Sequence, residues 1–364
     1  MSAFTPVGKL PASNNVSTVR VIDSTSTIHY PAKYFFETPI EGHEDLNCPA
    51  FSFLVTDSSG KRNVLFDLGI RKDWETGFPK FFVDGLKSRG GSVEVERDIA
   101  EILQDAAKRD ASLPSLDQIE SIIWSHHHFD HTGNPNLFPP HVSLIVGPGF
   151  KSAILPGYPA DPESPTVSAM WEDRDLIELD FNDSSRTLHI GRFKAYDYFG
   201  DASFYLLNTP GHAPGHISGL ARVSPDTFVL FGGDAAHHAG EIRPHDGHPL
   251  PANVIIHSSQ KYSKGAGCPC EVLERINPQQ SKTKPYYVPS DDFCSDRQEA
   301  LDSLLGLGEL DAQDGVFIIL AHDRLLKDVL PLFPKKINDW RKDDLDAKTR
   351  WLFVDDFAAA ADKA

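Results

Sequence analysis

Short apolar runs alternate with turn-forming residues through the first third of the chain. The runs SFLVT (52–56) and NVLFDLG (63–69) flank the turn-forming tetrapeptide DSSG and predict two neighbouring strands. Residues 118–123 and 143–147 form further apolar runs that predict buried strands. From about residue 95 to residue 108, apolar positions recur with helical spacing, which predicts a helix ahead of the strand at 118–123.

A second series of apolar runs lies between residues 185 and 231. These runs are SRTLHIG, FKAYDYF, SFYLLNT, GLARVS and TFVLFGG, and their spacing is typical of a β-meander. A helix is expected near 296–305, a strand in GVFIILA (315–321) and a final helix through 339–348.

Three segments interrupt this pattern. Residues 1–20 are rich in Ser, Asn and Pro and predict a loosely held N-terminal arm. Residues 156–175 hold many prolines and acidic residues, which indicates a loop. Residues 239–294 combine Pro, Gly, His and Ser without clear periodicity. Because such a length is unusual for a plain connection, we expect this insert to be a functional lid or an oligomer contact.

Composition narrows the classes of function. The chain has 364 residues, 40% of them hydrophobic, and a formal net charge of -17. That charge disfavours binding to nucleic acid or to an anionic membrane. The sequence shows neither a signal-peptide pattern nor an apolar run of roughly 18 residues that would span a bilayer. The four cysteines, with Cys268 and Cys270 only one residue apart, are interpreted as reduced structural thiols of a cytoplasmic protein.

The segment SHHHFDHTGN carries the first candidate chemistry. His126, His128, Asp130 and His131 fit the pattern H-x-H-x-D-H directly after the predicted strand at 118–123. Imidazole and carboxylate groups at this spacing suit Zn²⁺ and its first-row neighbours. One catalytic zinc usually takes three protein ligands and a water molecule, so four candidates already suggest two ions.

Three later strand ends repeat the arrangement of an apolar run followed by a polar residue. SFYLLNTPGHAPGH offers His212 and His216, TFVLFGGD ends on Asp234, and VFIILAHD supplies His322. Independent surface histidines would not be expected to follow buried strands so regularly.

Taken in order, HxHxDH, TPGHxPGH, GGD and strand-AHD resemble the metallo-β-lactamase-fold hydrolases, especially their N-acyl-homoserine-lactonase-like branch. The resemblance covers about residues 20–330. It implies an α+β fold, the four-layer αβ/βα sandwich, in which two mixed β-sheets face each other with helices outside. It also implies a 21–335 catalytic domain that carries the 239–294 insert, followed by a helical extension over 336–364.

The resemblance further implies a ligand set for two ions. Metal 1 would be bound by His126, His128 and His212, and metal 2 by Asp130, His131 and His322, with Asp234 bridging both. Asp67, in VLFDLG, matches an aspartate that supports the site from behind without binding metal. Two Zn²⁺ per chain are expected, although Mn²⁺, Fe²⁺ and Co²⁺ suit the same ligands.

A pair of divalent ions about 3.5–4 Å apart can share a water molecule whose pKa falls toward neutrality. The resulting bridging hydroxide would attack a carbonyl carbon, and Asp130 would relay a proton to the leaving group. His237 stands where related lactonases commonly have a substrate-facing tyrosine. Either it donates a hydrogen bond to the carbonyl oxygen, or it is an exposed loop histidine.

The remaining histidines are assigned structural roles. His127 alternates with the ligands, so we expect it, like Phe129, to point back into the protein. His216 is expected to orient its loop. His238, His245 and His248 are placed on the surface of the insert.

The predicted function is a metal-dependent hydrolase that opens a lactone or related lactam of a small apolar molecule, in secondary metabolism or xenobiotic degradation. Asp234 argues against classical β-lactamases, which have Cys or Ser near this point. A thioesterase of polyketide metabolism is the alternative, followed by a non-catalytic binding protein that kept the fold. The expected partner is the small-molecule substrate, and a homodimer through the insert or the arm is a further possibility.

Overall fold

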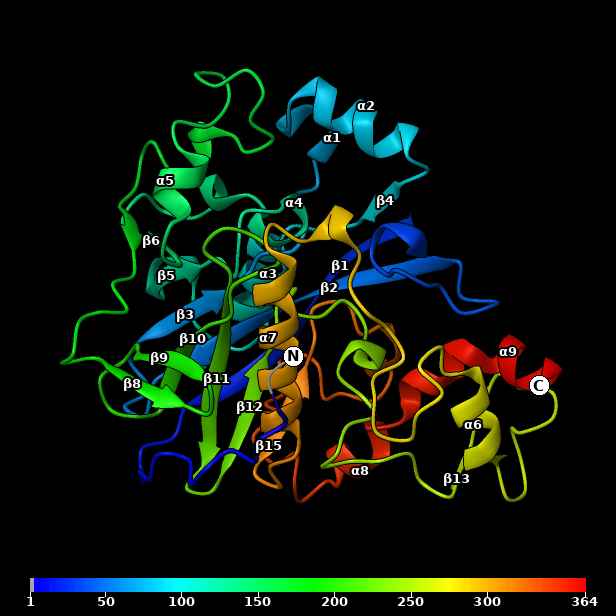
Figure 1. Ribbon diagram of the computed structural model, residues 1–364. Helices are drawn as coiled ribbons and strands as arrows, with labels where there is room; N and C mark the ends of the chain where they lie inside the picture. The colour runs from blue at the N-terminus through cyan, green and yellow to red at the C-terminus, as the bar shows by residue number, and fades with distance from the viewer. Residues whose placement is uncertain (1–2) are drawn as a thin grey trace.

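Two mixed β-sheets form the centre of the computed structural model, which describes residues 3–364 (Figure 1). The first two residues of the predicted N-terminal arm lie outside this range. The larger sheet has seven strands in the order β4-β1-β2-β3-β5-β6-β7. These strands are β1 Thr18–Pro31, β2 Asp45–Thr56, β3 Asn63–Phe66, β4 Ser92–Val95, β5 Ile119–Ile123, β6 Ser143–Val146 and β7 Leu176–Glu178.

The second sheet has six strands in the order β15-β12-β11-β10-β9-β8. They are β8 Thr187–Ile190, β9 Phe193–Asp197, β10 Phe204–Asn208, β11 Ile217–Ser224, β12 Thr227–Phe231 and β15 Val316–Ile319. The predicted meander is confirmed, because β8 to β12 pair antiparallel in sequence order. A two-stranded ribbon of β13 Asn253–Val254 and β14 Cys268–Pro269 lies within the insert.

Helices surround the two sheets (Figure 1). The α-helices are α1 Trp74–Gly77, α2 Lys80–Ser88, α3 Ile99–Arg109, α4 Phe129–Thr132, α5 Phe150–Ile154, α6 Cys270–Ile276, α7 Arg297–Asp311, α8 Leu345–Thr349 and α9 Ala358–Lys363. The 3-10 helices are η1 Ala32–Tyr34, η2 Leu116–Gln118, η3 Pro135–Leu137, η4 Ser168–Met170, η5 Ala239–Glu241, η6 Asp291–Phe293, η7 Arg324–Leu326 and η8 Leu352–Phe357. Within residues 3–364, none of these helices combines the length and apolar character needed to cross a bilayer.

The strands bury alternate residues on opposite faces, as their period of two requires. In β2, Phe53 faces the second sheet and stacks on Phe231 of β12, with ring centroids 4.0 Å apart, whereas Leu54 belongs to a separate apolar cluster. The same alternation separates Phe317 from Ile318 in β15. One apolar core therefore lies between the sheets and another lies outside them, and the expected αβ/βα sandwich is confirmed.

Parallel strands in both sheets carry the chain toward one edge of the sandwich. β3, β5 and β6 run parallel in the larger sheet, and β12 runs parallel to β15 in the smaller one. The carboxyl ends of parallel strands meet at the same edge of a sheet, so the loops after β3, β5, β12 and β15 are brought together. This explains why the polar residues that follow these strands form one site.

Two predicted helices differ from the structure. The region predicted as one helix from residue 95 begins in β4, and α3 starts only at Ile99, where Asp98 and Glu101 form a capping box. The final helix predicted over 339–348 is mostly turn. Its helical part is α8, and the chain continues through η8 into α9. In Figure 1, α9 lies beside α6 of the insert.

Candidate metal centre

The H-x-H-x-D-H segment makes a sharp turn between β5 and the short helix α4. His128 is the N-cap of α4, and the backbone N–H groups of His131 and Thr132 bond to its carbonyl oxygen. The turn places Asp130 and His131 on the first helical turn, while His126 lies in the bend between β5 and α4. Four candidate ligands within six residues can therefore face the same volume.

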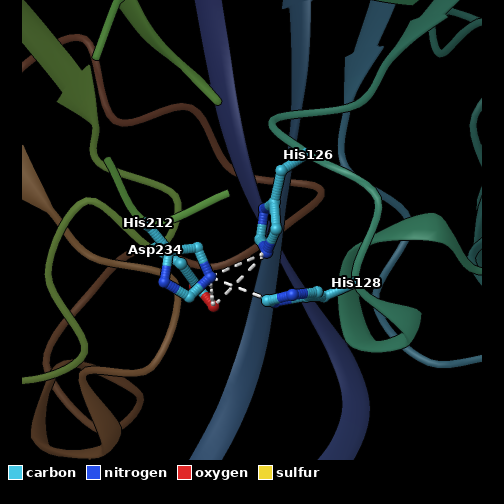
Figure 2. Close-up of side chains that lie close together, drawn as sticks. All are labelled: His126, His128, His212 and Asp234. Atoms are coloured by element: carbon cyan, nitrogen blue, oxygen red, sulfur yellow. Dashed lines mark hydrogen bonds and ion pairs between the residues drawn. The ribbon is translucent and has the colours of Figure 1, made fainter. Parts of the chain in front are cut away.

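The first ligand cluster joins this segment to the loop after β10 (Figure 2). Nε2 of His212 lies 3.2 Å from Nε2 of His126 and 3.0 Å from Nδ1 of His128. Oδ2 of Asp234 lies 3.6 Å from Nε2 of both His126 and His212. Three imidazole nitrogens and one carboxylate oxygen thus converge as ligands of a single divalent ion would.

The second cluster uses the other oxygen of the same aspartate. Oδ1 of Asp234 lies 3.0 Å from Nε2 of His131 and 3.0 Å from Nε2 of His322. Oδ2 of Asp130 lies 3.4 Å from His322 Nε2 and 3.7 Å from His131 Nε2. Asp234 therefore presents one carboxylate oxygen to each of the two clusters.

Hydrogen bonds on the far side of the rings leave Nε2 of three histidines facing the site. Nδ1 of His131 donates to Oδ2 of Asp67 at 2.8 Å, and Nδ1 of His322 donates to the carbonyl oxygen of Pro49 at 2.6 Å. His126 Nδ1 lies 3.0 Å from Oγ of Ser125, which itself donates to Asp67 Oδ2. A neutral imidazole that donates through Nδ1 keeps its lone pair on Nε2, the form that binds metal.

Burial favours the metal-binding protonation states as well. Desolvation lowers the pKa of His126, His128 and His212 well below the usual value, so these rings are neutral. Burial also lowers the pKa of His131, but the carboxylates around it, Asp234 first, more than reverse this and raise it. Such excess negative charge next to neutral donors is what a bound cation compensates.

The site passes a direct test of whether its residues fit a metal. His131 Nε2 and Asp234 Oδ1 are buried and make no hydrogen bond with any described residue, although they lie 3.0 Å apart. A void of about 50 Å³ opens beside the second cluster, lined by Asp130, Asp234 and His322 among others. The donor set, the lone-pair directions and the void all suit a divalent metal centre.

Asp234 itself is held by a neighbouring histidine. Nε2 of His216 accepts the backbone N–H of Asp234 at 3.0 Å, while its Nδ1 donates to the carbonyl oxygen of Thr209. Gly233 adopts φ +54, and a Cβ there would lie 2.9 Å from His216 Nε2 and 3.0 Å from the Cβ of Ser125. The GGD sequence therefore permits the close approach, and His216 has the loop-orienting position expected for it.

His237 lies inside the centre. Its side chain is 5% exposed, and Nε2 lies 3.4 Å from Asp234 Oδ2. The ring is parallel to that of His322, with an interplanar angle of 6°, and Phe35 packs edge-on at 4.9 Å. The interpretation of His237 as an exposed loop histidine is wrong.

Other sequence expectations need correction. His127 and Phe129 do not point back into the protein but line a cavity at the site, because the turn into α4 breaks the strict alternation. His238 and His245 are buried and His248 is half-buried, not on the surface of the insert. Long-range partners, which local composition does not reveal, explain their burial: Asp356 for His238 and Asp311 for His245.

A third group of possible ligands consists of His43, His238 and Asp356. In this group the lone pair of His238 Nδ1 is used in a hydrogen bond and is not free to bind a metal. His238 Nδ1 accepts the backbone N–H of Gly240 at 3.0 Å, so the neutral ring carries its proton on Nε2 and donates it to Asp356 at 3.1 Å. His43 Nδ1 is hydrogen-bonded to the hydroxyl of Tyr287 at 2.6 Å. We interpret this group as a hydrogen-bonded support for the segment that carries His237.

A cavity of about 560 Å³ opens onto the centre. His128, Asp130 and His212 form its metal-facing end, together with His127. Its walls are mostly apolar and include the following side chains: Tyr30, Phe81, Phe82, Leu86, Phe129, Pro165, Ala213 and Pro214. Sequence reasoning missed the contribution of α2, since its aromatic residues lie far from every metal motif. The one feature of the sequence that could have indicated this wall is the grouping of aromatic residues on one face of an amphipathic helix.

Comparison with known proteins settles the family. No family model matches the sequence. The chain is 42% identical over 357 residues to "Gamma-lactamase FDB1" of Fusarium pseudograminearum, an alignment that covers 96% of this chain and 84% of that protein. It is 38% identical over 362 residues to "Metallo-hydrolase mfmC" of Annulohypoxylon moriforme, with 98% and 91% covered.

A solved structure agrees with these relatives in fold. It is an N-acyl homoserine lactone hydrolase with N-hexanoyl-L-homoserine bound at its catalytic metal centre, and it superposes with a TM-score of 0.56. The match has 19% identity and covers 88% of this chain and 99% of the other.

The chain belongs to the metallo-β-lactamase superfamily. As a superfamily member with the described donor set, it is a metal-dependent hydrolase.

Proposed function

We propose that this hydrolase binds two divalent ions, Zn²⁺ by default, and opens the ring of a lactone or lactam of small, largely apolar molecules. The observation that carries the proposal is the division of Asp234 between two ligand clusters at the end of the cavity. His126, His128 and His212 would hold one ion, and Asp130, His131 and His322 the other.

The bound ions would supply an activated water molecule and a Lewis acid for the carbonyl oxygen. The protein residues position the substrate and move protons. His237 Nε2, beside Asp234 and next to the ring of His212, is placed to donate a hydrogen bond to the carbonyl oxygen as negative charge develops there. Asp130 lines the cavity and would transfer a proton to the departing ring oxygen or nitrogen.

The cavity supports a substrate with an apolar body. Phe82 and Phe129 face each other edge-on, with ring centroids 5.1 Å apart, and Leu86 continues the same wall. A volume of about 560 Å³ is within the range of pockets that enclose small organic ligands. The same wall lacks the row of basic side chains that a nucleotide or nucleic acid would need, since Arg89 is the one cationic residue among the described lining residues.

The relatives favour the same class of bond. "Gamma-lactamase FDB1" and a second relative, "Gamma-lactamase MBL2" of Gibberella moniliformis, 43% identical over 249 residues, both carry names that describe cleavage of a cyclic amide. The structural neighbour cleaves a cyclic ester. Lactones and lactams present the same ring carbonyl, so both belong in the first panel of substrates.

The test is hydrolysis by the zinc-loaded protein of three matched series: five-membered lactones, the corresponding lactams and acyclic acyl thioesters with the same apolar group. Ring opening of lactones or lactams, with about two ions per chain by metal analysis, is the expected result. Cleavage of thioesters alone would make the chain a thioesterase. Two bound ions without turnover of any series would leave a binding protein and refute the hydrolytic proposal.

A further inference from the structure

Glu241 is a buried carboxylate next to the centre that none of the proposed roles uses. It is 2% exposed, and no lysine or arginine of the described residues forms an ion pair with it. Burial of a carboxylate without a cationic partner costs desolvation free energy, so we expect Glu241 to have a specific role at this position.

Part of that reason is the backbone of the preceding residues. Glu241 Oε2 accepts the backbone N–H of His237 at 2.6 Å and that of His238 at 3.2 Å, which caps η5. The two side chains then leave the capped segment toward different partners. His238 bonds to Asp356, and His237 enters the metal centre.

Backbone capping alone does not require a charge. The amide oxygen of a glutamine would accept the same two N–H groups. What a glutamine would not supply is the negative charge that faces the ring of His237, whose Nδ1 lies 3.8 Å from Oε2 of Glu241. This distance is too long for a hydrogen bond, so the contact is electrostatic, and the low dielectric of a buried site strengthens it.

The imidazole of His237 therefore lies between two carboxylates. Nδ1 faces Glu241 at 3.8 Å and Nε2 faces Asp234 at 3.4 Å. Phe35 on one side and the parallel ring of His322 restrict tilting of the ring. Rotation of the ring by half a turn about the Cβ–Cγ bond would place Cδ2 beside Glu241 and Cε1 beside Asp234. The two carboxylates therefore favour the observed orientation, in which nitrogen atoms and not C–H groups face them.

We propose that Glu241 is a positioning residue, which holds His237 with Nε2 toward the site where the substrate carbonyl reacts. The inference rests on the proposed function for its catalytic consequence. Its structural consequence, the orientation and polarisation of one imidazole, holds whether or not the right substrate has been found.

The kinetic test is a double-mutant cycle with the zinc-loaded enzyme. Glu241→Gln keeps an acceptor for the backbone N–H groups and removes the charge. We expect kcat to fall about tenfold with KM nearly unchanged, the size of effect typical of groups that orient a site residue. In the His237→Ala background the same substitution should change kcat less than about twofold, because the residue through which it acts is gone. An equal loss in both backgrounds, or no loss in either, would overturn the proposal.

A matched control separates positioning from stability. Glu309 is also 2% exposed and also accepts a backbone N–H, that of Thr5 at 2.6 Å, but its partner is Arg192 and it lies outside the centre. Glu309→Gln should lower Tm and leave kcat unchanged. If it lowered kcat as much as Glu241→Gln does, loss of stability would explain both results and the positioning role would fail.

A readout independent of turnover uses the nitrogen resonances of the His237 ring in the zinc-loaded protein, assigned by comparison with His237→Ala. Glu241→Gln should shift these resonances, and unchanged resonances would refute the proposal. If the wild type cleaved no substrate but the resonances shifted, the proposed function would fail and the positioning role would stand. If Glu241→Gln does not fold, Glu241→Asp replaces it in the double-mutant cycle. This variant keeps the charge but moves it away from His237 by one methylene, and the same results are expected.

Discussion

Replacing Asp67 by asparagine should selectively weaken the second metal site. Oδ1 of Asp67 accepts the backbone N–H of Ser125 at 2.7 Å, and Oδ2 accepts from Ser125 Oγ and from His131 Nδ1, each at 2.8 Å. An asparagine has the same shape but one acceptor oxygen and one donor group. In either orientation, its amide N–H₂ meets a donor, the Ser125 N–H or the His131 N–H.

The magnitude follows from the hydrogen bond that is lost. If the N–H₂ faces His131, the ring must move its proton to Nε2, the atom that points at Asp234, and the lone pair for the metal disappears. If it faces the backbone of Ser125, the turn before the ligands shifts. A hydrogen bond to a charged group contributes about 1.5–3 kcal/mol. At about 1.4 kcal/mol per tenfold, the affinity for the second ion should fall roughly 10- to 100-fold.

The assay is a zinc titration of the metal-free protein against a chelator that competes for the ions. Two binding events are expected for the wild type, and Asp67→Asn should weaken the one assigned to Asp130, His131 and His322. Asp356→Asn is the matched control, because it also removes a carboxylate that accepts from a histidine, His238, outside the two clusters. Unchanged affinities for both ions in Asp67→Asn would refute the argument that this carboxylate sets the proton on His131.

Three further predictions concern the bridge, the support of the site and the cavity. Asp234→Asn should lose most bound metal and most activity while its circular dichroism stays that of the wild type, and retained turnover would contradict the bridging role. For Asp356, burial would raise the pKa, but the hydrogen bond from His238 and the neighbouring Arg324 lower it to about 2. A carboxylate whose pKa is depressed in the folded state stabilises the protein above about pH 4, and this stabilisation is lost as the pH falls toward 2. Urea unfolding should therefore show that Asp356→Asn is less stable than the wild type by about 2 kcal/mol at pH 7. The difference should shrink below pH 4. Phe82→Ala should raise KM for apolar substrates about tenfold with little change in kcat, because one aromatic contact of about 1–1.5 kcal/mol is lost. The control is Lys80→Ala, on the exposed side of the same helix, which should leave KM unchanged.

The ligand motifs could be predicted from the sequence because each follows a strand that its own apolar run identifies. Ile119–Ile123, Thr227–Phe231 and Val316–Ile319 are buried throughout or nearly so, and His126, Asp234 and His322 come within a few residues of their ends. Parallel pairing then brings these ends to one edge. The loop-orienting position of His216 could be anticipated in the same way, from its place in TPGHAPGH.

Side-chain direction near the turn into α4 could not be predicted as well. The expectation for His127 and Phe129 assumed strand-like alternation. Residues 125–127 instead form a bend, and in the helical turn that begins at residue 129 successive side chains are rotated by about 100° rather than 180°. Both residues therefore line the cavity.

By itself, the sequence determined which residues can bind metal and which strands deliver them, because hydrophobic period and ligand chemistry are local properties. The tertiary structure decided which candidate ligands lie together in each cluster, that Asp234 divides its two oxygens between the clusters, and that α2 supplies the aromatic wall. It also decided the surroundings of Glu241 and His237. These features depend on distances between segments far apart in the chain, and such distances are set by the packing of the two sheets, not by the spacing of residues within any one motif.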